Sequence, residues 1–243
     1  MELPVKSIID IHSHMLPAVD DGCGSREEAL AMLRIYEAQN VEAVICTPHY
    51  GQFSGANVEK AYQWLKSASA GTNLRVYLGN EILYTGSVLR DIRSGKARRL
   101  AGTDWILVEF EEWDRFSTPA EEILEGMRKL SESEFRPILA HPERYASLQN
   151  HPEYCRPITE LGVKLQINAY DIRKNVNTNT RNLTRKLLED QLVSFVGSDA
   201  HGAVRRAPDL LDGVQWIYDH CPEDYADAIV HDNAEEIIKR GSA

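Results

Sequence analysis

The stretch "IIDIHSHMLPAVDDG", residues 8–22, places two histidines one residue apart directly after an apolar run. The run "SIID" (7–10) is typical of a buried strand. In an extended segment, residues i and i+2 point to the same side, so His12 and His14 can aim at one point. The stretch therefore predicts a strand whose C-terminal end carries a chemical site.

Six further short apolar runs recur along the chain, each rich in Val, Ile or Leu. They are "AVIC" (43–46), "RVYL" (75–78), "WILV" (105–108), "RPILA" (136–140), "KLQI" (164–167) and "SFVG" (194–197). Longer amphipathic stretches separate them, which is typical of βα units and parallel strands. The sequence thus predicts an α/β fold with seven strands.

The stretches between the runs carry helix signals. We expect a helix over 25–39 with Ser25 as its N-cap, and a second over 118–132 with Thr118 as its N-cap and Pro119 at its first position. Residues 207–240 predict two or three further helices. No Pro/Gly/Ser-rich linker and no fixed-period repeat divides the 243 residues, so we expect a single domain, 1–243.

Composition excludes several classes of function. The formal net charge is −10 and no long Lys/Arg cluster is present, which disfavours nucleic acid as a partner. No apolar run approaches the roughly 18 residues of a membrane span, and the N-terminus does not read as a signal peptide. We therefore expect a cytoplasmic protein without a transmembrane segment.

The cysteines indicate neither a disulfide framework nor a thiolate zinc site. Cys23, Cys46, Cys155 and Cys221 are widely spaced and form no CxxC pair. None is followed six residues later by the arginine of cysteine-dependent tyrosine phosphatases. We expect all four to be inert thiols.

Histidines and acids gather where the predicted strands end. The segments after the seven runs are "HSH", "TPHY", "GNE", "EF", "HPER", "NAY" and "SDAH". In parallel α/β folds the carboxyl ends of the strands converge on one face. The other histidines, His151, His220 and His231, lie away from the strand ends and are expected at the surface.

The converging set needs a compensating positive charge. Its eight members are His12, His14, His49, Glu81, Glu109, His141, Asp199 and His201. Taken singly, each is more often structural than a ligand; together they would be costly to desolvate without a divalent metal. Imidazole and carboxylate donors without thiolate suit zinc, manganese or iron, and eight donors exceed one tetrahedral ion. The sequence predicts two or three metal ions.

The ordered motifs resemble a known family. "DIHSHMLPAVDDG", "TPHY", "GNEI", "LVEF", "LAHPERY" and "VGSDAH" are similar to those of the polymerase and histidinol phosphatase (PHP) superfamily. Within it they most resemble the bacterial PHP-type protein-tyrosine phosphatases of capsule and exopolysaccharide operons. The resemblance covers about residues 8 to 208. It implies a distorted (β/α)7 TIM-like barrel whose mouth holds up to three ions, often manganese, on the same eight residues.

The resemblance also implies catalytic and substrate-binding roles. Arg144 of "HPER" matches the arginine that binds the phosphoryl group, for which a guanidinium fork is suited. Arg205 or Arg206 could add a second contact or be an ordinary surface arginine. Asp21 could assist proton transfer with His201, or Asp21 could be a turn residue.

Phosphotyrosine selectivity would require an aryl pocket. Tyr50, Phe53 and Tyr84 are candidates for its wall and could equally be packing residues. The polar segment "NVNTNT" (175–180) suggests no role.

The function implied is hydrolysis of phosphotyrosine by a metal-activated water, without a covalent phosphoenzyme. The expected substrate is the tyrosine-rich tail of a bacterial tyrosine kinase that regulates capsule or exopolysaccharide synthesis. Two alternatives stay open. One is a small-molecule phosphoesterase, acting on histidinol phosphate or a nucleotide, and the other is a non-catalytic adaptor stabilised by metal.

Overall fold

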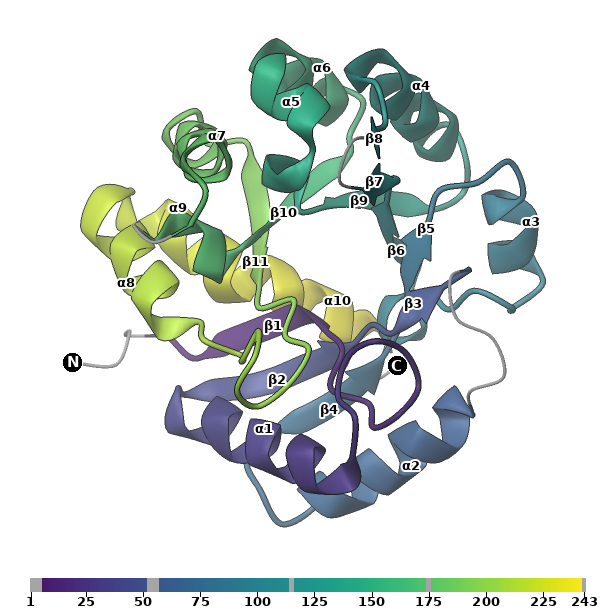
Figure 1. Cartoon of the computed structure of the whole chain (residues 1–243), viewed down its shortest axis with the longest axis vertical. Coiled ribbons are helices and arrows are strands. Elements are labelled where there is room, and N and C mark those ends of the chain that lie inside the picture. Colours follow the sequence, from purple (N-terminus) through teal and green to yellow (C-terminus); the bar gives the residue numbers. More distant parts are fainter. Residues whose placement is uncertain (1–5, 52–56, 114–115, 174–175, 242–243) are drawn as a thin grey trace.

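The computed structural model describes residues 6–51, 57–113, 116–173 and 176–241. Its main strands form two parallel sheets that curve around a common centre (Figure 1). One sheet has the order β1-β2-β4 and the other β11-β10-β9-β6-β5-β3. The bounds of these strands are β1 Ile8–Ser13, β2 Val41–Cys46, β3 His49–Tyr50, β4 Arg75–Leu78, β5 Glu81–Leu83, β6 Trp105–Glu109, β9 Arg136–Ala140, β10 Lys164–Asn168 and β11 Val193–Gly197.

The seven predicted strands are all present, so the predicted α/β class with parallel strands is confirmed. The structure adds β3 and β5, which are too short to leave a periodic pattern, and an antiparallel pair, β7 Glu112–Trp113 with β8 Phe116–Ser117. The two short parallel strands pair with each other, His49 opposite Glu81. They therefore bring two of the candidate ligands side by side.

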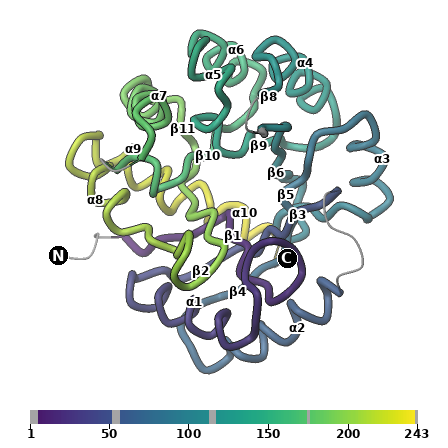
Figure 2. The backbone as a smooth tube through the Cα atoms, viewed as in Figure 1, coloured from purple at the N-terminus to yellow at the C-terminus, as the bar shows by residue number. Residues whose placement is uncertain are grey.

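The two sheets join at β1 and at the segment after β11. The backbone N–H of Asp199 donates to the carbonyl of His12, and that of His14 donates to the carbonyl of Ala200, both at 2.8 Å. Figure 2 traces these two distant parts of the chain to the same place. On the other side, no ladder among the described strands joins β4 to β6, and a short helical turn, η1 (Leu100–Gly102), touches both. The barrel is therefore distorted at β4.

Helices cover the outside of the sheets, and the last of them crosses one end of the barrel (Figure 1). Their bounds are α1 Arg26–Ala38, α2 Val58–Ser69, α3 Val88–Arg93, α4 Ala120–Ser131, α5 Ala146–Asn150, α6 Cys155–Glu160, α7 Thr178–Glu189, α8 Leu211–His220, α9 Glu223–Asp227 and α10 Asn233–Gly241. The predicted Ser25 cap is confirmed, because its hydroxyl accepts from the N–H of Glu28. Three α-helices over 207–241 agree with the prediction for that region.

The predicted cap of α4 is wrong by one residue. The N-cap is Pro119, and no side chain caps the helix. The hydroxyl of Thr118 instead donates to the carbonyl of Glu111 at 3.0 Å, so it ties the helix entry to the segment after β6. Asn177 of the unassigned polar segment has a local role, since its side chain accepts from two N–H groups at the start of α7.

The interior of the barrel is apolar at one end and polar at the other. Ile9, Ile11, Ile45 and Leu107 pack with other inward-facing residues, and α10 closes this end with apolar side chains that include Ile237. The C-terminal ends of the strands lie at the opposite end, where the predicted site residues gather.

Candidate metal centre

The two histidines of β1 converge as predicted. Their Nε2 atoms lie 3.3 Å apart, and both side chains are fully buried. The Nδ1–H of His12 donates to Gln166 Oε1 at 2.9 Å, and that of His14 donates to Asp20 Oδ2 at 2.8 Å. When Nδ1 of each neutral ring carries the proton, both Nε2 lone pairs point at one place, which is the arrangement that a metal ion requires.

Two carboxylates complete this group. Glu81 Oε2 lies 3.2 Å from both Nε2 atoms, and Asp199 Oδ1 lies 3.5 Å from both. We call His12, His14, Glu81 and Asp199 the inner group; its donor atoms lie within 4.8 Å of one another. Two imidazoles and two carboxylates are a donor set that suits zinc, manganese or iron.

Glu81 also belongs to a second group. The same Oε2 lies 3.2 Å from His49 Nδ1, which lies 3.0 Å from Glu109 Oε1. The other oxygen, Oε1, lies 2.7 Å from His141 Nε2. One carboxylate thus faces both groups, which is the geometry of a bridging ligand.

A third group lies nearer the mouth. It consists of His14, Asp21, His49 and His201. Asp21 Oδ1 lies 3.5 Å from His49 Nε2 and 3.7 Å from His201 Nε2, and the Asp21 side chain is 51% exposed. The eight predicted ligands therefore lie in one site together with Asp21, in three overlapping groups.

The pKa values of the metal-free site reflect its crowding. Burial opposes protonation of His14, but the carboxylates of Asp20 and Glu81 outweigh it and raise its pKa to about 9. The pKa of His49 is likewise raised to about 9, against burial, by Glu81 and Glu109. Burial would raise the pKa of Glu81, but the neighbouring histidines hold it well below its ordinary value. Protons thus occupy places that metal ions would take in a loaded site.

His201 differs from the other histidines. Burial and the charge of His14 lower its pKa to about 3. Its Nδ1–H donates to the backbone carbonyl of Asp199 at 2.9 Å, which leaves Nε2 unprotonated at neutral pH. A neutral imidazole with a fixed tautomer is the form that binds a metal ion.

The residues present therefore fit a cluster of divalent ions. His141 Nδ1 is buried and has no hydrogen-bond partner among the described residues, as expected of a nitrogen whose partner is not a protein group. Backbone strain points the same way. Three of the described non-glycine residues with positive φ are His141, Asp199 and Arg206, at 34°, 50° and 51°. Strain of this kind concentrates at functional sites.

Two arginines approach the inner group from the solvent side. Arg144 donates to Asp199 Oδ2 at 2.5 Å and, through Nε, to Asp171 Oδ2 at 2.9 Å. Arg206 donates to the same Asp199 oxygen at 2.6 Å. Both line a cavity of about 240 Å³ together with Asp21. Arg205 does not line it, so Arg206 is the second arginine of the site.

Comparison with known proteins places this architecture in a family. Residues 8–239 match the family described as "Capsular polysaccharide synthesis, CpsB/CapC". The chain belongs to the CpsB/CapC family. Tyrosine-protein phosphatase CpsB of Streptococcus agalactiae is 29% identical over 243 residues, covering 96% of this chain and 98% of that protein. Tyrosine-protein phosphatase YwqE of Bacillus subtilis is 29% identical over 205 residues, covering 82% and 79%.

Solved structures agree with this assignment. The crystal structures of Bacillus subtilis YwqE and Streptococcus pneumoniae CpsB, described as unique metal-dependent tyrosine phosphatases, include a chain that superposes with a TM-score of 0.85 and 26% identity, covering 96% of this chain and 95% of that one. Histidinol phosphate phosphatase of Lactococcus lactis superposes with a TM-score of 0.56 at 14% identity, covering 97% and 94%. That second likeness shows a shared fold, and the predicted α/β architecture with parallel sheets is confirmed.

The structure of this CpsB/CapC family member adds residues that the sequence did not single out. Asp20 accepts from His14 Nδ1, and also from the backbone N–H of His49 at 3.0 Å, so one carboxylate orients two ligand segments. Asn168 donates to both Asp171 and Asp199, at 3.4 and 3.3 Å. The doubled aspartate of "DDG" was the available signal for Asp20, because ligating histidines commonly donate to a carboxylate.

Glu143 of the "HPER" box is another such residue. Its side chain is fully buried, and Oε1 accepts from the backbone N–H of Asn168 at 2.8 Å. Burial and the neighbouring Asp171 raise its pKa well above the ordinary value for a glutamate. Glu143 therefore fixes the loop that carries Arg144.

The predicted aromatic wall is only partly in place. Tyr50 does not line the cavity and packs partly against the hydrophobic core. Phe53 lies outside the described residues. Tyr84 stacks on Phe110 with ring centroids 4.7 Å apart, and Phe110 lines the cavity. Among the described residues, Phe110, directly after Glu109, is thus the aromatic wall residue of this cavity.

The three histidines away from the strand ends differ in their exposure. His151 and His220 are exposed as predicted, but His231 is not a surface residue; its side chain is 13% exposed and its Nδ1–H donates to the carbonyl of Ser7.

In the part of the chain that the structure describes, no helix is both long and apolar enough to cross a membrane.

Proposed function

We propose that this chain is a metal-dependent protein-tyrosine phosphatase. The observation that carries the proposal is the meeting of Arg144 and Arg206 on one oxygen of Asp199, whose other oxygen faces the inner group. Anion-binding groups and metal donors thus share one cavity, which suits a phosphate ester. The named relatives are tyrosine-protein phosphatases. We further propose that residues 1–243 act as one domain.

His12, His14, His49, Glu81, Glu109, His141, Asp199 and His201 would hold the ions. When bound, the ions lower the pKa of water and withdraw charge from phosphoryl oxygens. We propose manganese as the native metal, in two or three copies, with iron or zinc as alternatives, because the donors are imidazoles and carboxylates without thiolate.

Arg144 would bind the phosphoryl group. Its guanidinium is fixed by Asp171 through Nε, and its side chain is 32% exposed to the cavity. An arriving phosphate competes with Asp199 for the fork, which can contact two phosphoryl oxygens at once. Arg206 is the second contact on the same side.

Asp21 would assist proton transfer at the mouth of the metal centre, where its carboxylate lies between His49 and His201. A departing phenolate, with a conjugate acid of pKa about 10, needs less assistance than an aliphatic alkoxide. Phe110 offers an apolar wall for the aryl ring. Tyr50 and Phe53 remain proposed substrate contacts, although Tyr50 does not line the cavity in this structure.

The proposed substrate is the phosphotyrosine-bearing tail of a bacterial tyrosine kinase that regulates capsule or exopolysaccharide synthesis. The family description and the named phosphatases support it. We propose that the protein acts in the cytoplasm. Its four cysteines are unpaired, as expected in a reducing compartment.

Two other functions are compatible with the metal groups. A small-molecule phosphoesterase would use the same donors and arginines on histidinol phosphate or a nucleotide. An adaptor that keeps metal only for stability would need neither arginine at the cavity. The arginines therefore favour an enzyme.

The deciding experiment compares kcat/KM for a phosphotyrosyl peptide, a phosphoseryl peptide and histidinol phosphate, with Mn²⁺ added. We expect the phosphotyrosyl peptide to be preferred. A preference for histidinol phosphate would replace the first function with the second. No turnover of any of the three by metal-loaded protein would favour the adaptor.

A further inference from the structure

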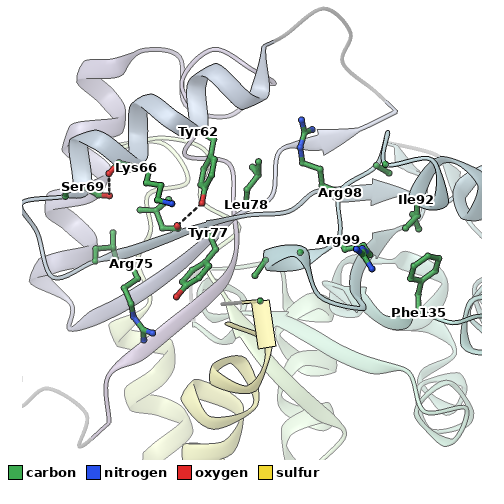
Figure 3. Close-up of a pocket in the computed structure, with 18 of the residues that line it drawn as sticks. Tyr62, Lys66, Ser69, Arg75, Tyr77, Leu78, Ile92, Arg98, Arg99 and Phe135 are labelled. Atoms are coloured by element: carbon green, nitrogen blue, oxygen red, sulfur yellow. Dashed lines mark hydrogen bonds between the residues drawn. The ribbon is translucent and has the colours of Figure 1, made fainter. Parts of the chain in front are cut away.

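A large cavity of the described structure lies away from the metal centre. Its volume is about 1160 Å³, and it shares no lining residue with the cavity at the donors. Its walls are formed by α2 with the loop after it (between residues 62 and 72), by β4 with the residue before it (74–78), by several residues between 92 and 102 that do not include Lys96, by residues 134–135 and by Gly241. We call it the β4 groove; Figure 3 shows many of its side chains.

The floor of the groove is an open sheet edge. Among the described strands, β4 pairs only with β2. The N–H of Gly79 donates to the carbonyl of Cys46 in β2. Because main-chain groups alternate in direction along a strand, Val76 and Leu78 direct theirs away from β2, toward the groove. The hydroxyl of Tyr62 donates to the Val76 carbonyl at 3.1 Å, so a side chain and not a strand meets that edge (Figure 3).

The groove is also cationic in an acidic protein. The chain has a net charge of −10, yet five basic residues line this cavity. Arg75 and Arg93 pair with carboxylates. The side chains of Lys66, Arg98 and Arg99 form no ion pair or hydrogen bond with any residue that the structure describes. Three cations are therefore available to an incoming anionic partner.

We propose that the β4 groove binds an extended acidic peptide segment as an added strand. The open edge supplies main-chain donors and acceptors, which is how strand addition gains affinity. The unpaired cations on both sides of the strand select carboxylates on the incoming segment. Tyr62 and Tyr77 flank the edge on opposite faces of β4 and give apolar surface to its other side chains (Figure 3). A small anion would use the cations but leave the edge unpaired.

The test for charge uses a fluorescent peptide of alternating glutamate and valine and the full chain, with binding followed by anisotropy. We expect Lys66→Glu and Arg99→Glu each to weaken binding about fivefold. Lys96→Glu is the matched control, because Lys96 is an exposed cation in the same loop that does not line the groove. Equal effects from Lys96→Glu and Arg99→Glu, or no effect from either groove variant, would overturn the proposal. Thermal unfolding verifies that each variant is folded.

The test for strand addition uses the same peptide N-methylated on alternate residues, in both registers. One register removes the N–H groups that face β4 and should abolish binding, and the other should retain it. Hydrogen exchange at the amide of Leu78 should slow when the unmodified peptide binds. If both methylated peptides bind equally well and tripolyphosphate displaces them, the groove binds small anions and the strand proposal is wrong. These readouts do not involve the metal centre, so they stand apart from the proposed phosphatase activity.

Discussion

The metal centre and the β4 groove both gather charged side chains, but they do so in opposite surroundings. At the centre, Glu81 and Asp199 are 1% and 2% exposed, and each carboxylate contacts several side chains. In the groove, Lys66 and Arg99 are exposed and make no such contacts. Buried charges cost much to leave unpaired, whereas exposed ones cost little. Substitutions at the centre should therefore damage the site itself, and those in the groove should affect only what binds there.

The largest effect is expected for the ligands. His141→Ala and Asp199→Ala should reduce kcat by orders of magnitude, because each removes a donor that the charged cluster needs. Chelation followed by dialysis should abolish activity, and added Mn²⁺ should restore it. Elemental analysis beside the kinetics separates lost metal from lost chemistry. Full activity in metal-free protein would contradict the proposed centre.

Arg144→Ala should have the next largest effect. We expect a loss of about a hundredfold in kcat/KM for a phosphate ester, from removal of one charged oxyanion donor. Metal content should stay near that of the wild type, because Arg144 contacts Asp199 Oδ2 rather than the oxygen facing the inner group. Loss of metal in this variant would instead assign Arg144 a structural role.

Asp20→Asn should weaken metal binding by about tenfold to a hundredfold, because a carboxylate that orients His14 would be lost. Competition with a chromogenic chelator measures this change. Asp219→Asn is the control, since it alters an exposed carboxylate that belongs to none of the three donor groups and does not contact His14. Equal losses from both variants would contradict the orienting role of Asp20.

The thermal stability of the metal-free protein should change with pH in the opposite direction to its metal affinity. We expect this effect to be smaller than those of the substitutions above. The pKa of His14 rises from 6.5 to about 9 on folding, so its contribution to stability is complete below pH 6.5 and is lost as the pH rises through 9. Tm of the chelated protein should therefore fall over this interval, while metal affinity rises because fewer protons compete. Differential scanning calorimetry at several pH values tests the first part. A Tm that rises from pH 6.5 to 9 would contradict it.

The smallest effect is expected at the cysteines. Cys46 is fully buried, and burial, followed by the charge of Asp10, raises its thiol pKa well above the ordinary value, so it is not a nucleophile. Cys46→Ser should leave kcat/KM unchanged and lower Tm by about 3 °C, through the cost of burying a hydroxyl. An inactive Cys46→Ser enzyme beside an active His141→Ala enzyme would indicate cysteine chemistry.

The predictions from sequence succeeded where the signal was local. All seven apolar runs became main strands, and a histidine or acid closely follows six of them, which marks those strand ends. Thr118 shows the limit of local reasoning. Threonine commonly caps helices, but the hydroxyl of Thr118 donates to the carbonyl of Glu111 instead, and α4 has no side-chain cap. Tertiary contacts outweigh a preference of that size.

Contacts between distant segments could not be foreseen in the same way. Gln166 orients His12 from 154 positions away, and Asp171 holds Arg144 from the loop after a different strand. These partners are ordinary polar residues, and nothing in their own neighbourhood of the sequence marks them. They became visible only when the strands lay side by side.

The sequence by itself determined where the seven main strands lie along the chain and the chemical identity of the donors at their ends. Both follow from side-chain type and from a two-residue period, which act over a few neighbouring residues. Only the tertiary structure decided that Glu81 faces two donor groups, that Arg206 and not Arg205 meets Asp199, and that β4 has an open edge. Those outcomes depend on how far each strand of the distorted barrel is displaced relative to its neighbouring strands. That displacement is set by the packing of residues far apart in the chain.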